Sequence, residues 1–258
     1  MADLRNMNAR ASQARTYDAS IDAGLRAYMI RVYNLMAAGL VITGLAALGT
    51  MMLATTNDPS AAAAQLGNGR MLTNVGTALY GSPLRWVVML APLGMVFYLS
   101  ARIQKMSVSG AQTAFWIFAG LMGLSLSSIF LVYTPASIVQ TFFITATAFG
   151  ALSLYGYTTK RDLSAMGSFL FMGLIGIIIA SLVNLFLASS ALQFAISVIG
   201  VLVFAGLTAY DTQQIKEMYY EGDSDTVAGQ KAIMGALRLY LDFINLFMFL
   251  LQFLGNRE

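Results

Sequence analysis

Seven long apolar segments follow one another along the chain, separated by polar connections. Each stays apolar over about 20 residues, the length a helix needs to cross a bilayer, without the strict alternation of a barrel strand. A helix also satisfies its own backbone hydrogen bonds in hydrocarbon. The pattern predicts an all-α polytopic membrane protein with seven transmembrane helices. We expect them at residues 28–54, 84–102, 112–133, 136–158, 166–188, 191–214 and 232–254.

The polar parts of the chain add two expectations. Residues 1–27 carry mixed charge and are expected to form a cytoplasmic, partly disordered tail ahead of a transmembrane domain at 28–258. Of the two longer connections, residues 55–83 are rich in Gly and Asn and are expected to form a loop with a short interfacial helix. Residues 215–231 carry most of the remaining charge.

Composition supports a membrane protein and excludes several functions. Hydrophobic residues make up 58 % of the 258 positions and charged residues 10 %, whereas a soluble domain carries about 25 % charged residues. The chain has no Cys and no His, which excludes disulfides, thiolate metal sites and the usual general base. It also lacks phosphate-loop and metalloprotease motifs. We therefore expect neither an enzyme nor a cofactor, and a lipid bilayer rather than nucleic acid as the surrounding partner.

The distribution of Lys and Arg predicts the orientation. One set of alternate connections holds ten: Arg5, Arg10, Arg15, Arg26, Arg102, Lys105, Lys160, Arg161, Lys216 and Lys231. The other set holds three: Arg70, Arg85 and Arg257. Positive residues concentrate on the cytoplasmic side, so the N-terminus is expected inside and the C-terminus outside.

Two aspartates stand out because the apolar segments around them are nearly free of charge. Asp211 lies near the cytoplasmic end of the sixth segment and Asp242 about ten residues into the seventh, so both fall in the cytoplasmic half. An Asp at a helix centre costs at least ~2.5 kcal/mol, so each needs a partner or a water-filled cavity. Sharing a dry site, the two would not both ionise easily, and the pair could sense pH or offer oxygen ligands to Ca²⁺. Alternatively, each is only a structural hydrogen-bonding or ion-pair group.

Three further polar residues belong to the candidate site. Arg102 ends the second segment on the same side and either pairs with one of the aspartates or anchors to headgroups. Arg238 precedes Asp242 by four residues, so it shares its helix face and favours a local salt bridge. Asn245, one turn beyond Asp242, either lines the same cavity or bonds across helices.

Four stretches of the chain resemble the Bax inhibitor-1 family, also called TMBIM. They are GLSLSSIFLVYT (123–134), TAFGALSLYGYTTKRDLSAMGSFLFMGLIG (147–176), AYDTQQIK (209–216) and LYLDFINLF (239–247). The resemblance spans about residues 25–256 and points to a bacterial inner-membrane member. It implies a seven-helix fold whose C-terminal helix is central and surrounded by the other six, and a pH-sensitive Ca²⁺ leak.

The resemblance also implies roles for individual residues. The family's pH-sensing and gating aspartate pair matches Asp211 and Asp242, and its basic latch at the end of the second helix matches Arg102. This sequence departs from a bacterial relative at Ala91, where that relative has an acidic residue, and Arg238 occupies a position that need not be charged. The resulting hypothesis is a pH-sensitive calcium leak channel. The alternative is a non-transporting regulator that binds and modulates a membrane-anchored AAA protease, as some bacterial relatives do, or another membrane protein, with the N-terminal tail as the contact.

Overall fold

The computed structural model describes residues 2–67 and 69–256, and the side chains of residues 22–67 and 69–256. Within these residues, seven helices are long and apolar enough to cross a membrane, which confirms the expected all-α polytopic fold. The spans are Asp22–Ala54, Leu84–Lys105, Val108–Leu131, Pro135–Thr158, Ser164–Leu187, Ser190–Glu217 and Asp225–Leu254. Most side chains of the expected tail at residues 1–27 lie outside the described set.

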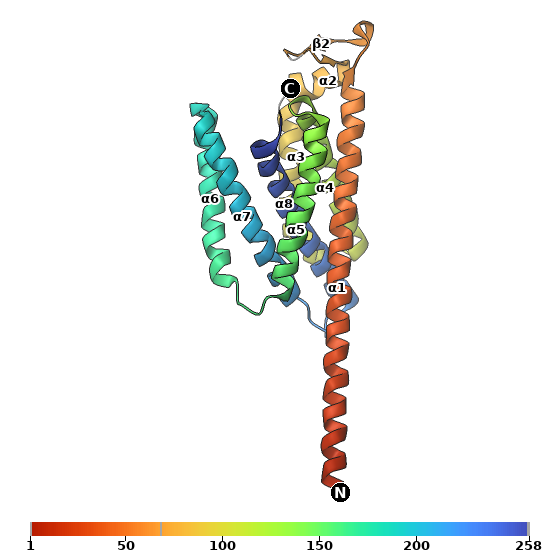
Figure 1. The fold of residues 1–258 in the computed structure, drawn as a ribbon. Coiled ribbons are helices and arrows are strands. Elements are labelled where there is room, and N and C mark those ends of the chain that lie inside the picture. Colours follow the sequence, from red (N-terminus) through yellow and green to blue (C-terminus); the bar gives the residue numbers. More distant parts are fainter. Residues whose placement is uncertain (1, 68, 257–258) are drawn as a thin grey trace.

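Figure 1 shows the long helices arranged around α8. They are α1 (Ala2–Ala54), α3 (Leu84–Arg102), α4 (Val108–Leu126), α5 (Pro135–Thr158), α6 (Ser164–Leu187), α7 (Ser190–Glu217) and α8 (Asp225–Leu254). Short helical turns lie at Ile103–Lys105, after α3, and at Ser127–Leu131, after α4. We call the face with residues 103–107, 159–163 and 218–224 the N-side (Figure 1, bottom) and the face with residues 55–83, 188–189 and 255–256 the C-side (top).

The connection at residues 55–83 is more ordered than a loop. It contains β1 (Thr55–Thr56), a turn at Pro59–Ala61, β2 (Ala64–Gln65), β3 (Met71–Leu72), α2 (Asn74–Gly76) and a turn at Thr77–Gly81. The strands form an antiparallel sheet in the order β1-β3-β2. The expected short helix is present, whereas strands of two residues leave no alternating pattern that sequence reasoning could have found. Tyr80 Oη lies 2.7 Å from Ser127 Oγ and ties this segment to the turn that follows α4.

Hydroxyl side chains define where four of the long helices begin. Ser107, Thr134, Ser189 and Ser224 each accept a hydrogen bond from a backbone N–H in the first turn of α4, α5, α7 and α8, at 3.2–3.4 Å. Such caps satisfy N–H groups that have no partner inside the helix. Because the first turns of α8 are polar, hydropathy placed its start at residue 232, whereas the capped helix begins at Asp225.

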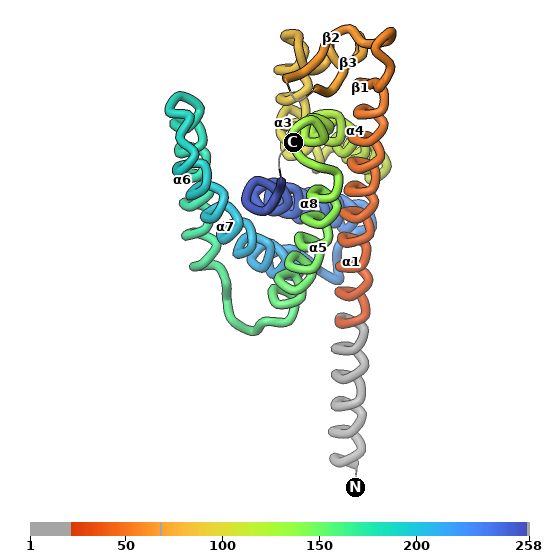
Figure 2. Tube along the Cα trace, turned by 45° about the horizontal axis from the view of Figure 1, so that its top comes forward, coloured from red at the N-terminus to blue at the C-terminus, as the bar shows by residue number. Residues whose placement is uncertain are grey.

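α8 occupies the centre of the bundle, as expected. It packs against α1, α4, α5 and α7. In the most apolar part of α8, 67 % of the residues are buried, against 17–39 % for the other spans. In contrast, α6 packs chiefly on α7 and lies on its outer side, away from α1 (Figures 1 and 2).

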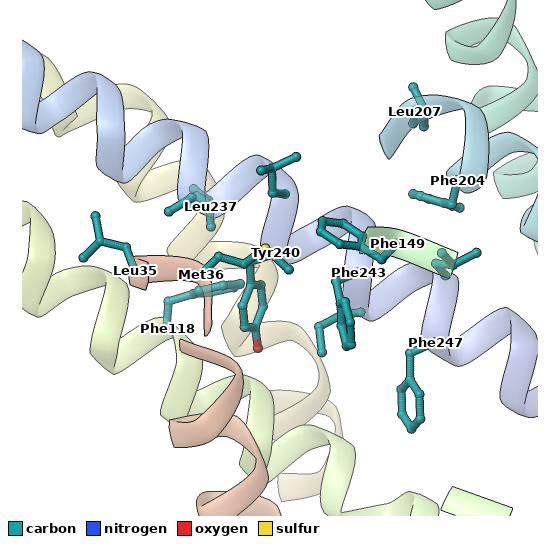
Figure 3. Close-up of a cluster of buried hydrophobic side chains, with 14 of the residues drawn as sticks. Leu35, Met36, Phe118, Phe149, Phe204, Leu207, Leu237, Tyr240, Phe243 and Phe247 are labelled. Carbon is teal, nitrogen blue, oxygen red and sulfur yellow. The ribbon is translucent and has the colours of Figure 1, made fainter. Parts of the chain in front are cut away.

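Tyr240 anchors α8 to its neighbours. Its fully buried ring meets Phe115 and Phe118 of α4 edge-on, with centroids 5.9 and 5.2 Å apart. Its Oη lies 2.6 Å from Thr43 Oγ1 on α1, so the buried hydroxyl is satisfied. Figure 3 shows this cluster continuing along α8 through Phe243 and Phe247. The opposite face of α8, turned towards α6 and α7, carries the polar residues Arg238, Asp242 and Asn245.

Candidate functional site

The two aspartates predicted from charge scarcity meet inside the bundle. α7 supplies Asp211, which is half-buried, and α8 supplies Asp242, which is 4 % exposed. Their carboxyl groups lie within hydrogen-bonding reach of each other. An ionised carboxylate can only accept hydrogen bonds, so a bond between two carboxyl groups requires a proton on one of them. Protonation of one aspartate would let the two groups bond directly to each other.

One oxygen of this pair is unsatisfied. Within the described part of the chain, no group offers a hydrogen bond to the buried Oδ2 of Asp242. Leaving a buried polar atom without a partner costs free energy, more so when it is charged. A proton shared with Asp211, a water molecule or a cation would satisfy this atom.

The carboxyl pair lines a cavity of about 870 Å³ between α6, α7 and α8. Its polar wall includes Asp211, Arg238, Asp242 and Asn245, and its apolar wall includes Phe171 and Phe204. The structure thus gathers four of the five residues singled out from the sequence. A cavity beside buried carboxyl groups is the environment that makes an intramembrane acid tolerable.

Arg238 lies at the N-side end of the cavity. Its exposed side chain is one turn before Asp242 and close enough to act electrostatically on both carboxyl groups. Among the described residues, however, none of its nitrogens is within 4.0 Å of a carboxylate oxygen. Arg238 also lines a separate N-side pocket of about 500 Å³, together with Gln104 and Lys231. Its side chain therefore stands between the N-side pocket and the aspartates.

Arg102, unlike Arg238, lies outside the wall of the aspartate cavity. It ends α3 with an exposed side chain. In the described part of the chain it forms no hydrogen bond or ion pair with Asp211 or Asp242. Its role as a latch remains a prediction.

Asn245 extends the site towards the C-side. Its Nδ2 donates a hydrogen bond to the Leu241 carbonyl at 2.8 Å. This bond does not use the Oδ1 atom of Asn245. The residue lines both the aspartate cavity and an adjoining pocket of about 340 Å³ that reaches Ser181 and Phe249. Asn245 is thus the link between two successive cavities on the same face of α8.

Reasoning from charge missed the neutral polar residues that hold α7 in place. Gln213 is buried, accepts a hydrogen bond from Leu163 N at 2.9 Å and donates one to the Arg161 carbonyl at 2.8 Å. It thereby fastens the α5–α6 loop to α7, two residues after Asp211. The available signal was the pair of polar side chains at 212 and 213, directly after the aspartate in a largely apolar span.

Asp211 and Asp242 are the two acidic residues that line the cavity. Among the described residues, no group of three or more His, Cys, Asp or Glu side chains is arranged to hold a metal ion. The site therefore offers a hard cation two carboxyl groups and the Asn245 amide oxygen.

Comparison with known proteins places this fold and site in a family. The family described as "Inhibitor of apoptosis-promoting Bax1" matches residues 25–258. The chain belongs to the Bax inhibitor-1 family. This confirms the resemblance drawn from the four sequence stretches, one of which contains Asp211 and another Asp242.

Relatives in this family cover nearly the whole chain. Inner membrane protein YbhL of Escherichia coli is 50 % identical over 238 residues, which is 92 % of this chain and 94 % of that protein. Uncharacterized proteins of Rickettsia prowazekii and Caulobacter vibrioides are 48 % and 46 % identical over all of both chains. Together with the seven apolar helices, these relatives confirm a multi-pass protein of the bacterial inner membrane.

Proposed function

We propose that this protein is a pH-sensitive cation leak pathway, with Ca²⁺ as the leading permeant ion, gated by Asp211 and Asp242. The observation that carries the proposal is the buried carboxyl pair in the wall of a cavity of about 870 Å³ within the membrane-spanning bundle. Carboxylate and amide oxygens are the ligands that Ca²⁺ prefers. A site with few such ligands binds Ca²⁺ weakly, and weak binding allows the ion to pass through.

Gating follows from the proton that the two aspartates share. With the proton in place, the hydrogen bond between Asp211 and Asp242 joins α7 to α8, and the pathway is closed. When the proton leaves, two like charges remain in contact in a medium where charges are poorly screened. Separation of α7 from α8, or entry of a cation, relieves this repulsion. Titration of the pair thus biases a two-state opening without any histidine.

The orientation is part of the same proposal. The N-side carries the larger number of Lys and Arg residues, so we place it in the cytoplasm, with the C-terminus outside. Asp211 and Asp242 then lie in the cytoplasmic half of the membrane. The pair would respond to cytoplasmic pH, with Arg238 at the entrance from that side.

The direct test is Ca²⁺ flux into proteoliposomes, scanned from about pH 5 to pH 8, the range across which a perturbed carboxyl pair would titrate. Wild type is compared with Asp211→Asn, Asp242→Asn and the double variant. Asp58→Asn, an exposed aspartate outside the spans, is the matched control. We expect a pH-dependent flux in wild type and control, and loss of the pH dependence in the double variant. Folded protein with no flux above empty liposomes at any pH would overturn the proposal.

The alternative activity is a regulator that transports nothing and binds a membrane-anchored AAA protease through the N-terminal tail. The two proposals differ in which residues matter. A leak survives removal of residues 1–20 and loses its pH dependence when the aspartates are replaced. A regulator that acts through its tail loses its effect on the protease when residues 1–20 are removed and keeps it in the Asp211→Asn and Asp242→Asn variants.

A further inference from the structure

A chain of side-chain amides crosses from α6 to α8 on the C-side of the bundle. Asn184 Nδ2 on α6 donates to Gln193 Oε1 on α7 at 3.0 Å. Gln193 Nε2 then donates to Gln252 Oε1 on α8 at 2.8 Å. Three helices are thus joined in series by two hydrogen bonds. We call Asn184, Gln193 and Gln252 the amide chain.

Neighbouring groups give the amide chain two further hydrogen bonds. Asn184 is 9 % exposed, although the next three residues of α6, 185–187, are apolar and exposed. Its Oδ1 accepts a hydrogen bond from Ser189 N in the α6–α7 turn at 3.0 Å. At the other end, Gln252 Oε1 accepts a second bond from Ser197 Oγ at 3.3 Å. Each amide therefore uses its donor or acceptor groups within the bundle, where water is scarce.

The position of the amide chain relates it to the cavities. Residues 238, 242, 245, 249 and 252 are spaced by three or four, so they form one face of α8. The aspartate cavity joins the smaller pocket through Asn245, and that pocket ends at Phe249. The Phe249 ring is stacked on Phe204 of α7 with centroids 5.7 Å apart. Gln252 lies one turn further, at the C-side end of the same face.

We propose that the amide chain is the C-side gate of the pathway, a second closure in series with the aspartate pair. The inference rests on the proposed leak function and names the residues that close its other end. On the proposed path, a cation that leaves the aspartate cavity towards the C-side passes between the α6–α7 hairpin and α8, where the Gln193–Gln252 bond joins α7 to α8. Opening breaks this bond and frees amide oxygens, which are suitable ligands for a hard cation.

This gate differs from the aspartates in its response to pH. Amide side chains do not ionise, so the bonds of the amide chain have no titration of their own. The charged residues of α6, α7 and α8 all lie two or more turns closer to the N-side than the amide chain: Asp211, Lys216, Glu217, Asp225, Lys231, Arg238 and Asp242. At the C-side end itself, the titratable side chain of Tyr133 lies against Gly255, just after α8. We therefore expect variants of the amide chain to raise the flux at every pH and to leave the shape of the pH profile unchanged.

The first test replaces single amides by a side chain of similar size. Gln193→Leu and Gln252→Leu each remove the bond between α7 and α8, and interhelical bonds of this kind correspond to about a threefold to tenfold shift in an equilibrium. We expect Ca²⁺ flux in proteoliposomes to rise by that factor. Ser197→Ala removes the second donor to Gln252 together with a bond inside α7 to the Gln193 carbonyl, leaves the Gln193–Gln252 bond in place and should have a smaller effect. Gln140→Leu, an exposed glutamine at similar depth in α5, is the control and should match wild type.

The second test does not depend on Ca²⁺ flux. The chain has no cysteine, so Ile177→Cys places a single buried thiol in the pocket beneath the amide chain. A membrane-impermeant thiol reagent added from the C-side should react about threefold to tenfold faster when Gln193→Leu is also present. Equal reaction rates, with equal flux in wild type and both Leu variants, would overturn the gate. If no variant conducts Ca²⁺ but the thiol becomes accessible, the gate stands and the leak proposal fails.

Discussion

Ser153 Oγ on α5 lies 2.9 Å from Thr212 Oγ1 on α7, directly beside Asp211 in sequence. Ser153 also shares a 2.7 Å bond with Tyr33 Oη on α1, and Thr212 donates to the Thr208 carbonyl at 2.7 Å. Consecutive residues of a helix point about 100° apart, so fixing Thr212 towards α5 turns Asp211 towards the cavity. The hydroxyl chain Tyr33–Ser153–Thr212 therefore sets the direction of one member of the carboxyl pair.

We predict that Ser153→Ala destabilises the bundle. The change removes a link between α1, α5 and α7, and interhelical side-chain bonds contribute about 0.6 to 1.7 kcal/mol. Thermal unfolding in detergent should show a lower midpoint than wild type. Thr147→Val is the control, because Thr147 is exposed on the same helix and, among the described residues, its hydroxyl bonds only to the Phe143 carbonyl of its own turn. Equal destabilisation by both changes would contradict a role for the hydroxyl chain.

A second prediction concerns the close approach of α5 to α7 at Gly156. A Cβ added at Gly156 would overlap the backbone of Ala209, and backbone cannot move aside as a flexible side chain can. Gly150, on the same helix, has open space where a Cβ would be. We expect Gly156→Val to cost about 1–3 kcal/mol or to prevent folding, as overpacking does. Gly150→Val, measured by the same thermal unfolding, should be close to wild type, and a similar loss in both would contradict the packing argument.

A third prediction concerns Asp58, in the connection on the C-side. Its Oδ1 accepts hydrogen bonds from Ser60 Oγ at 2.7 Å and Ser60 N at 2.8 Å, and these bonds lower the pKa of Asp58. A carboxyl group with a lowered pKa stabilises the folded turn above its unfolded pKa, and this contribution is lost as pH falls through the folded pKa. NMR titration of the Asp58 carboxyl should give a pKa below about 3.9. Ser60→Ala should move it up towards that value, and an unchanged pKa would contradict the assignment.

Much of this architecture was predictable because hydrocarbon imposes strict requirements. Seven apolar segments had to be helices, and their number and order are as expected. The meeting of Asp211 and Asp242 was also predictable, since α7 and α8 follow each other in the chain and the two aspartates lie at similar depth. Burying an ionisable group is so costly that each aspartate in an apolar span needs a partner.

The neutral polar contacts were not predictable in the same way. Asn184, Gln193 and Gln252 are ordinary residues in spans that contain other Ser, Thr, Asn and Gln side chains. Which of them meet depends on the rotation of each helix, and neither hydropathy nor charge specifies that rotation. The same freedom explains why Arg102 and Arg238 both looked able to reach the aspartates, whereas only Arg238 lines their cavity.

The last prediction separates these two arginines. Arg238 places a positive charge in the cavity wall, where it opposes the entry of a cation, whereas Arg102 is exposed at the end of α3. Arg238→Gln should therefore raise the initial Ca²⁺ flux several-fold, most clearly at low ionic strength, because salt screens exposed charges. Arg102→Gln should leave this flux and its salt dependence unchanged. If Arg102→Gln instead alters the pH profile and Arg238→Gln does not, the latch role implied by the family applies and Arg102 has to reach the aspartates in another conformation.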